Sequence, residues 1–283
     1  MSDGKEVGHL CFLMTEMLVR DVLREPKYSD PKRLEQFGFK GNSQFDEDGI
    51  IQEIFRRIGT TDKRFIEFGA GGAECENNTV YLTKKGWSGL WLDGNPKKCE
   101  FLKKNWAGAI RTGRIKVGGD IVHRDNVNDV FKKYGFTGEM DLLNIDIDGN
   151  DYWVWEKISV VNPRVVVLEY NAKYAPPMEW IMKYNPNHEF KKTDYMGASL
   201  ESMVKLSEKK GYKLVGCTLS GANAFFVRAD LAGDHFCAPY TAENHYQPAR
   251  YYLAKSVGKL SYNYAGMNPS YGAYVGEDGK TYE

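Results

Sequence analysis

Hydrophobic and polar residues follow two different periods along this chain. In the first 60 residues, apolar side chains recur every three or four positions, which predicts amphipathic helices over residues 5–24 and 46–58. From residue 64 onward, short apolar runs alternate with helical stretches. The apolar runs predict strands at 64–69, 89–93, 114–118, 141–148 and 164–170. The stretches between them predict helices at 78–85, 96–106, 126–134 and 152–158.

This alternation predicts an α/β fold. Strands that are apolar along their whole length are typical of a parallel sheet that helices cover on both faces. Residues 172–198 are rich in proline and polar residues and are expected to form a loop-rich insertion. After it come a predicted helix at 199–210 and two predicted strands, 212–219 and 224–227, joined by a hairpin connection at 220–223. We therefore expect a Rossmann-like, doubly wound, mostly parallel sheet of seven strands whose last strand is antiparallel.

The chain is expected to have three parts. Residues 1–42 are predicted to form a helical N-terminal extension, residues 43–232 the α/β domain, and residues 233–283 a tail. The tail holds half of the 18 tyrosines, mixed with glycine, asparagine and proline. Such an aromatic tail either packs over the domain or over a neighbouring subunit, or it acts as a lid over a substrate pocket.

Composition and charge narrow the class of protein. Lysine and arginine number 38, as do aspartate and glutamate, so the net charge is zero. This argues against a general nucleic-acid binder, which needs a basic excess. No apolar run approaches the ~20 residues of a membrane span, and the start of the chain does not resemble a signal peptide. The five cysteines include no CxxC pair, which favours a reducing cytoplasm over a disulfide framework or a zinc site.

The candidate binding and catalytic residues follow the predicted strands. In open α/β sheets, ligands bind just beyond the carboxyl ends of the strands. The first strand contains Glu67 and leads into Gly69 and Gly71, which permit a tight turn close to a ligand. Position 74 is a glutamate, whereas a dinucleotide fingerprint needs a third glycine there. Glu67 therefore favours a ligand that carries positive charge, such as S-adenosylmethionine, over the phosphates of a nicotinamide cofactor.

The next strand ends add the features of an adenosine site. Asp93 can accept hydrogen bonds from both ribose hydroxyl groups. Asp120 can accept from the adenine amino group while Ile121 covers the ring. Asn78 and Thr79 stand near the start of the helix after the glycine loop. They either cap that helix or form an anion site for the methionine carboxylate.

The fourth and fifth strands end in further polar residues. Asp146 and Asp148 are expected on the same side of an extended strand, where they repel each other unless one is protonated or a cation lies beside them. Glu169 and Asn171 follow the next strand with the same spacing. Asp146, Glu169 and Asn171 offer the oxygen ligands that Mg²⁺ prefers. The alternative for these residues is local hydrogen bonding within turns.

At this point the sequence resembles the class I S-adenosylmethionine-dependent methyltransferases. Within them it is similar to the FkbM-like family, many of whose members methylate hydroxyl groups of sugars and natural products. The resemblance covers roughly residues 40–230. The segments that carry it are 43–48 (SQFDED), 65–69 (FIEFG), 86–94 (GWSGLWLDG), 146–151 (DIDGND), 211–216 (GYKLVG) and 223–227 (NAFFV).

The resemblance implies roles for individual residues. It places Gln44 among the cofactor-binding residues, Glu67, Gly69 and Gly71 at the methionine part, Asp93 at the ribose, Asp120 at the adenine and Asp146 near the departing methyl group. Asp148 stands where the family more often has glutamate, so the role of that second acid does not transfer directly.

These features predict an enzyme that transfers a methyl group by in-line displacement to an oxygen of a small polar acceptor. Asp146 or Asp148 would act as general base, or Mg²⁺ would lower the pKa of the acceptor hydroxyl. His188, His235 and His245 are further candidate bases, although each is explained more simply as a surface histidine. Two alternatives stay open. One is another reaction of the same cofactor, an alkyl transfer or cyclisation that releases methylthioadenosine; the other is a non-catalytic binding protein that keeps the fold.

Overall fold

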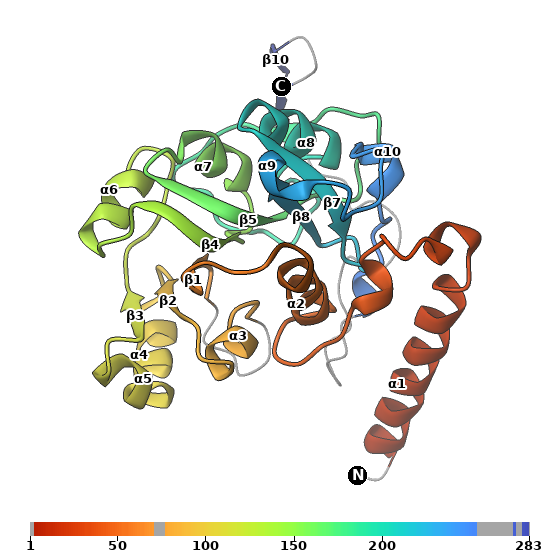
Figure 1. Ribbon diagram of the computed structural model, residues 1–283, viewed down its shortest axis with the longest axis horizontal. Coiled ribbons are helices and arrows are strands. Elements are labelled where there is room, and N and C mark those ends of the chain that lie inside the picture. The colour runs from red at the N-terminus through yellow and green to blue at the C-terminus, as the bar shows by residue number, and fades with distance from the viewer. Residues whose placement is uncertain (1–2, 71–76, 254–273, 276–278, 283) are drawn as a thin grey trace.

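The structure is a computed structural model that describes residues 3–70, 77–253, 274–275 and 279–282 of the chain. Its centre is a seven-stranded sheet with the strand order β3-β2-β1-β4-β5-β8-β7 (Figure 1). All neighbouring strands pair in parallel except that β8 runs antiparallel to both β5 and β7. The strands are β1 Arg64–Phe68, β2 Ser88–Leu92, β3 Ile115–Gly118, β4 Gly138–Ile145, β5 Val161–Glu169, β7 Tyr212–Cys217 and β8 Asn223–Arg228. The predicted Rossmann-like sheet, with its antiparallel last strand, is confirmed.

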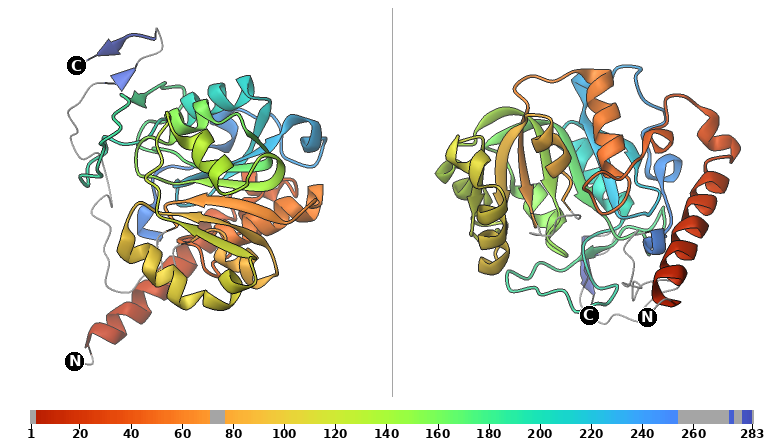
Figure 2. Two further views of the ribbon diagram at one scale, coloured as in Figure 1. Left: turned by 90° about the vertical axis from the view of Figure 1, so that its left-hand side faces the viewer. Right: turned by 90° about the horizontal axis from the view of Figure 1, so that it is seen from below.

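Helices cover both faces of the sheet, as the two further views show (Figure 2). Neighbouring strand residues serve opposite faces: Ile66 belongs to the apolar cluster that contains Phe131 and Trp155, whereas Phe65 belongs to the one that contains Ile54 and Leu102. This is why the strands are apolar along their length. The main helices are α2 Glu47–Ile58, α3 Val80–Lys84, α4 Pro96–Asn105, α5 Ala107–Arg111, α6 Val127–Lys133, α7 Asp151–Lys157 and α8 Leu200–Lys209.

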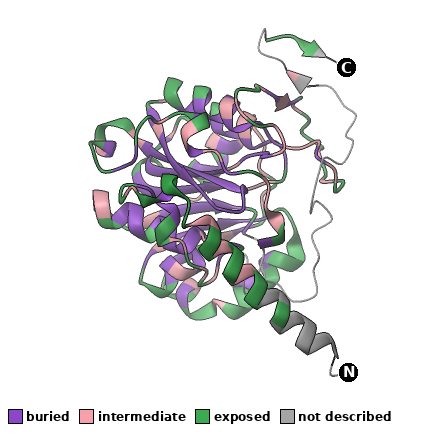
Figure 3. Cartoon of the chain, turned by 90° about the vertical axis from the view of Figure 1, so that its right-hand side faces the viewer, coloured by how far each residue is buried: buried purple, intermediate pink, exposed green. Residues whose placement is uncertain are grey.

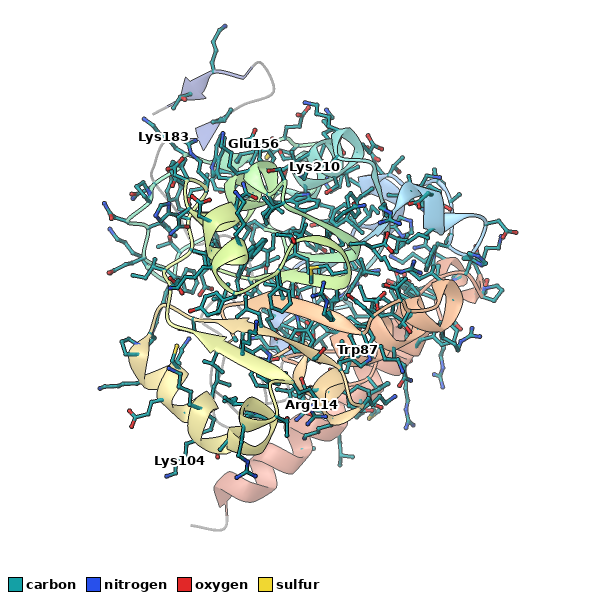
Figure 4. The ribbon with its side chains drawn as sticks, turned by 60° about the vertical axis from the view of Figure 1, so that its left-hand side comes forward. Trp87, Lys104, Arg114, Glu156, Lys183 and Lys210 are labelled. Atoms are coloured by element: carbon teal, nitrogen blue, oxygen red, sulfur yellow. The ribbon has the colours of Figure 1, made fainter. Side chains whose placement is uncertain are left out.

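Most helix boundaries follow the prediction, and α5 is the clearest omission. The predicted helix at 96–106 ends at Asn105, because the backbone of Trp106 leaves the helical region before α5 begins. Further along, Lys210 fastens the end of α8 to α7. Its Nζ donates a hydrogen bond to the carbonyl of Ile158 (2.8 Å), and its side chain lies close to Glu156 (Figure 4).

The N-terminal helix α1 (Asp3–Val22) stands away from the domain (Figure 1). Only its last turns pack on the body: Val19 and Val22, with Leu23, contact an apolar cluster that includes Tyr28 and Phe45. Two short 3-10 helices, η1 Pro26–Ser29 and η2 Glu35–Phe37, lead from there to α2. Within the described residues, no helix combines the length and the apolar character that a membrane crossing needs.

The first part of the predicted tail packs on the domain. The short helix α9 (Ala229–Ala232) directly precedes the tail. The tail itself contains α10 (Ala242–His245) and η3 (Tyr251–Leu253). Gln247 is buried; its side-chain oxygen accepts a hydrogen bond from Tyr28 Oη (2.8 Å) and its carbonyl accepts one from Tyr170 Oη (2.8 Å). Near the C-terminus, β9 (Tyr274–Val275) pairs with β6 (Ile181–Met182) of the insertion and with β10 (Thr281–Tyr282). The tail therefore touches both the domain and the insertion.

Candidate functional site

Three carboxylates gather where β4 and β5 end. The two strands pair in parallel up to Ile145 and Leu168, so the residues that follow emerge side by side. Asp146, Asp148 and Glu169 each place a carboxylate oxygen within 4.8 Å of the others. One oxygen of Glu169, Oε2, is buried and makes no hydrogen bond within the described part of the chain. An oxygen-rich group of this kind suits a hard divalent cation.

Burial and mutual repulsion raise the pKa of each member of this group. For Asp146 the pKa is raised well above its ordinary value, first by burial and then by the charge of Asp148. For Glu169 the order is burial and then the charge of Asp146. The pKa of Asp148 is also raised by burial, although Lys98 and His188 act against the rise. The group therefore holds more negative charge than its surroundings balance, and a cation would stabilise its ionised form.

The backbone turn between β4 and α7 differs from the predicted one. The strand ends at Ile145, so Asp146 and Asp148 do not lie on an extended strand as expected; Asp148 instead has a left-handed backbone, with φ +56°. Asp151 holds the turn, because its two carboxylate oxygens accept hydrogen bonds from the amides of Ile147 (3.0 Å) and Gly149 (2.9 Å). Strain of this kind in a non-glycine residue is common at functional sites.

Gly69 brings the end of β1 against this turn. Its φ is +60°, and a Cβ at this position would overlap the backbone carbonyl oxygen of Asp146. Glycine is therefore required here both for the left-handed backbone and for the close approach of two chain segments. The next glycine of the loop, Gly71, lies outside the described residues.

Glu67 is held by hydrogen bonds within the protein. It is buried, and Oε1 accepts hydrogen bonds from the amide of Asn78 (2.8 Å) and the side chain of Asn144 (3.2 Å), while Oε2 accepts from the hydroxyl of Thr79. Burial is the main cause that raises the pKa of Glu67 to about 7. These contacts make Glu67 a link between β1, β4 and the start of α3, and its contact with the methionine part of a cofactor stays a prediction.

Asn78 and Thr79 are likewise occupied inside the protein. The side chain of Asn78 donates to Asn144 Oδ1 (3.0 Å), and the hydroxyl of Thr79 also accepts from Trp91 Nε1 (2.8 Å). Asn77 supplies the cap, since its Oδ1 accepts from the amides of Thr79 (2.9 Å) and Val80 (3.1 Å). The side chains of Asn78 and Thr79 therefore do not cap α3, and the anion site for a methionine carboxylate stays a prediction.

The predicted adenosine residues divide into two groups. Asp93 ends β2 and has Lys98 Nζ 3.4 Å from its Oδ2, while Ile121 is 68% exposed and would be touched by a Cβ on Gly94. Asp93 and Ile121 therefore flank the same place. Asp120 is bound by Lys133 Nζ (2.7 Å) and Tyr134 Oη (2.7 Å), which hold its pKa below the ordinary value. Asp120 already accepts one hydrogen bond on each oxygen, and its contact with adenine stays a prediction.

The side chain of Asn171 makes its hydrogen bonds to backbone groups and not to the three carboxylates. Its amide nitrogen donates to the carbonyls of Asp194 (2.7 Å) and Met196 (3.0 Å), and its oxygen accepts from the amide of Lys173 (3.1 Å). Asn171 thus anchors the insertion, and Asp148 is the third acid beside Asp146 and Glu169.

The start of α2 adds acids to which the sequence analysis gave no individual role. Asp46 is buried against the amide of Leu219 (3.3 Å), and burial followed by the charge of Glu47 raises its pKa to about 7. Asp48 accepts hydrogen bonds from the amides of Gly41 (2.8 Å) and Ser43 (2.9 Å). The charge of Glu47 reaches Asp146 and also raises its pKa. Gln44, predicted to bind the cofactor, is exposed beside these acids.

The insertion and the tail each bring one side chain to this region. His188 Nε2 lies 3.1 Å from the carbonyl oxygen of Asp148, and its ring occupies the space that a Cβ on Gly149 would need. Tyr251 of the tail is buried, and the charge of Glu169 helps to raise its pKa. His245 is buried against the carbonyl of Cys237 (3.0 Å), and His235 follows α9, so only His188 of the candidate histidines is placed at the carboxylates.

Comparisons with known proteins concern the fold. No protein-family profile matches the chain, and no curated protein matches it. Similar solved structures include an O-methyltransferase domain of StiE, residues 961–1257, at 13% identity over 59% of this chain and 52% of that one, with a TM-score of 0.34. An O-methyltransferase from Bacillus cereus in complex with SAH is 12% identical over 76% of this chain and 88% of that one, with a TM-score of 0.39. A putative O-methyltransferase from Klebsiella pneumoniae is 13% identical over 62% of this chain and 76% of that one, with a TM-score of 0.37.

The chain spans about half the length of the StiE domain, 52%, and of the pyocyanin biosynthetic protein PhzM, 54%. The FkbM-like resemblance stays a prediction. What the structure itself presents is a Rossmann-like sheet whose carboxyl end carries three neighbouring carboxylates, of which Asp146 and Glu169 are partly buried and Asp148 is exposed.

Proposed function

We propose that this protein is an S-adenosylmethionine-dependent methyltransferase that acts on a hydroxyl group of a small polar acceptor, such as a sugar or a natural product. The observation that carries the proposal is the group of three carboxylates at the carboxyl ends of β4 and β5, Asp146, Asp148 and Glu169, which lie within 4.8 Å of one another and have raised pKa values. The pKa values of Glu67, Asp146 and Glu169 are all raised. The charge of Glu67 contributes to the rise at Asp146, and the charge of Asp146 contributes to the rise at Glu169. A cationic ligand relieves that repulsion, and a sulfonium is cationic.

The ribose and adenine would be held by the residues that follow β2 and β3. Asp93 offers carboxylate oxygens at the end of β2, and Ile121 offers an exposed apolar surface on the same side. An acid after the second strand that accepts from ribose hydroxyl groups is common to nucleoside-binding sheets of this type. The turn at Gly69 then directs the bound molecule toward Asp146.

The carboxylate group suits the transfer step. When bound, S-adenosylmethionine supplies the methyl group, and a divalent cation lowers the pKa of an acceptor hydroxyl. Asp146, Asp148 and Glu169 would hold such a cation, and the unpaired Oε2 of Glu169 supports this. Without a cation, an Asp146 carboxylate with a raised pKa is suited to accept the hydroxyl proton as general base. Alignment of the acceptor is then the main contribution of the surrounding residues.

Calorimetry with S-adenosylhomocysteine tests the cofactor directly. We expect the wild-type protein to bind it and Asp93→Ala to bind it about 10- to 100-fold more weakly, because a charged hydrogen bond contributes roughly 1.5–3 kcal/mol. Asp129→Ala, at an exposed acid of α6, is the matched control and should bind like the wild type. No binding by the wild type would contradict the proposal. With acceptors supplied, release of methylthioadenosine in place of S-adenosylhomocysteine would favour the other reaction type.

Mg²⁺ is expected to raise the thermal stability of the protein at about pH 8 and to have little effect at about pH 5. The folded-state pKa values of Asp46 and Glu67 are about 7 and that of Asp151 is about 6, all above their unfolded values. The folded protein therefore keeps protons that the unfolded chain releases, and its stability falls as the pH rises from about 4 through about 7. A bound cation offsets this loss of stability only at pH values at which the carboxylates that hold it are ionised.

Thermal melts with and without Mg²⁺ at the two pH values measure this effect. Asp146→Asn should lose most of the stabilisation by Mg²⁺, whereas Asp129→Asn should keep it, since Asp129 is exposed and is not a member of the carboxylate group. An equal effect of Mg²⁺ at both pH values, or in Asp146→Asn, would show that the cation acts elsewhere.

A further inference from the structure

The loop-rich insertion contacts the turn that carries Asp148. Most residues of the insertion, 172–198, are intermediate or exposed, whereas the strands of the sheet are buried (Figure 3). One side chain of the insertion nevertheless reaches the carboxylate group, since His188 Nε2 lies 3.1 Å from the backbone carbonyl oxygen of Asp148. A carbonyl oxygen can only accept a hydrogen bond, so Nε2 carries the hydrogen and donates it. His188 thus holds the backbone of a residue whose carboxylate belongs to the candidate cation site.

The position of His188 is set by further contacts between the insertion and the same turn. Asn150 Nδ2 donates a hydrogen bond to the carbonyl of Asn185 (2.7 Å), and Asn150 Oδ1 accepts one from the amide of Asn185 (3.4 Å). The amide of His188 donates to the same carbonyl of Asn185 (3.0 Å). At the end of the insertion, the amide of Gly197 donates to the carbonyl of Gly149 (3.1 Å). Contacts on either side of His188 therefore hold the insertion against the turn.

The backbone of Asp148 needs support of this kind. Its φ of +56° is in the left-handed region, which costs a non-glycine residue energy. Asp151 accepts hydrogen bonds from the amides of Ile147 and Gly149, the residues on either side of Asp148. His188 binds the remaining group, the carbonyl of Asp148 itself. Because the backbone sets the direction of the Cα–Cβ bond, Asp151 and His188 together fix the direction in which the Asp148 side chain leaves the turn.

The glycine that follows makes room for His188. A Cβ on Gly149 would lie 2.7 Å from His188 Nε2 and closer still to Cδ2. Gly149 is not among the residues with a positive φ, so the backbone does not require glycine at this position. We propose that His188 is a positioning residue: its hydrogen bond to the carbonyl of Asp148 holds the Asp148 carboxylate beside Asp146 and Glu169. This inference rests on the cation site of the proposed function.

Calorimetry with MgCl₂ on the full chain tests the proposal. We expect His188→Ala to bind Mg²⁺ about 10- to 100-fold more weakly than the wild type, as is typical when a group that orients a metal ligand is removed. His188→Gln should bind like the wild type, because its amide nitrogen can donate in place of Nε2, whereas the shorter His188→Asn should bind like His188→Ala. Thermal melts without Mg²⁺ should be similar for the glutamine and asparagine variants, since both lose the packing of the ring. His235→Ala, at an exposed histidine of the tail, is the matched control.

Gly149→Ala provides a second test, because the added methyl group would displace the His188 ring. It should weaken Mg²⁺ binding as His188→Ala does, and it should have little further effect when combined with His188→Ala. Equal Mg²⁺ affinities of the wild type and His188→Ala, equal affinities of the glutamine and asparagine variants, or additive losses in the double variant would overturn the proposal.

Binding of S-adenosylhomocysteine in the same samples separates this inference from the proposed function. A wild type that binds S-adenosylhomocysteine but no Mg²⁺ would overturn the role of His188 and leave the methyltransferase function standing. A wild type that binds Mg²⁺ in a His188-dependent way but no S-adenosylhomocysteine would contradict the methyltransferase function alone.

Discussion

Replacing Gly69 with alanine is expected to abolish measurable binding of S-adenosylhomocysteine and to lower the free energy of unfolding by about 3 kcal/mol or more. The backbone of Gly69 is left-handed, which costs an L-residue roughly 1–2 kcal/mol. The added Cβ would also overlap the carbonyl oxygen of Asp146, so β1 and β4 would have to separate at the point where their ends form the site. Calorimetry and chemical denaturation measure the two effects.

Gly113→Ala separates the two causes. Gly113 has a similar φ of +74°, but a Cβ added there has no neighbour within 4 Å. It should therefore show only the backbone cost of roughly 1–2 kcal/mol and normal ligand binding. If Gly69→Ala behaves like Gly113→Ala in both measurements, the close approach of the two strand ends is not what positions the site.

Asp141→Asn is expected to lower the free energy of unfolding by about 3–5 kcal/mol, because it removes the charge from a fully buried ion pair. Asp141 lies at the opposite end of the sheet from the site. Its oxygens lie 3.1 Å from Arg164 Nε and accept hydrogen bonds from the amides of Thr61 (3.0 Å) and Lys63 (2.7 Å). The substitution leaves the Arg164 guanidinium buried without its counter-charge. Denaturant titration measures the loss.

The neighbouring Asp62–Arg64 pair provides the control. Asp62 Oδ2 lies 2.6 Å from Arg64 Nε, closer than in the buried pair, but both side chains are about one-third exposed. Asp62→Asn should therefore cost less than about 1 kcal/mol. Similar losses for Asp62→Asn and Asp141→Asn would mean that burial is not the cause of the difference between the two pairs.

Much of the sheet was predictable because its strands stand out as short runs of apolar residues. Strands buried on both faces read as continuous apolar runs, and the connection after Cys217 signalled the antiparallel β8. Short elements gave no such signal. The strand β6 has two residues and exists because β9, from the far end of the chain, pairs with it. Pairing between segments so distant in sequence leaves no local pattern.

The site was predicted in its location and less well in its contacts. Parallel topology alone brings Asp146 and Glu169 together, so their proximity followed from the strand assignments. The role of Glu67 did not, since it depends on Asn144 and Thr79, which only the folded chain brings within hydrogen-bonding distance. The same holds for Asp120, which Lys133 and Tyr134 occupy, and for Asn171, which holds the insertion.

The sequence by itself determined the order of strands and helices, the mostly parallel sheet and the end of the sheet at which acids collect, because these depend on local periodicity and on the direction of each strand. The tertiary structure decided which acids converge and which are taken up by hydrogen bonds. That outcome depends on burial and on partners from distant segments: Asp146, Asp148 and Glu169 converge with raised pKa values, while the carboxylates of Glu67 and Asp120 are taken up by hydrogen bonds.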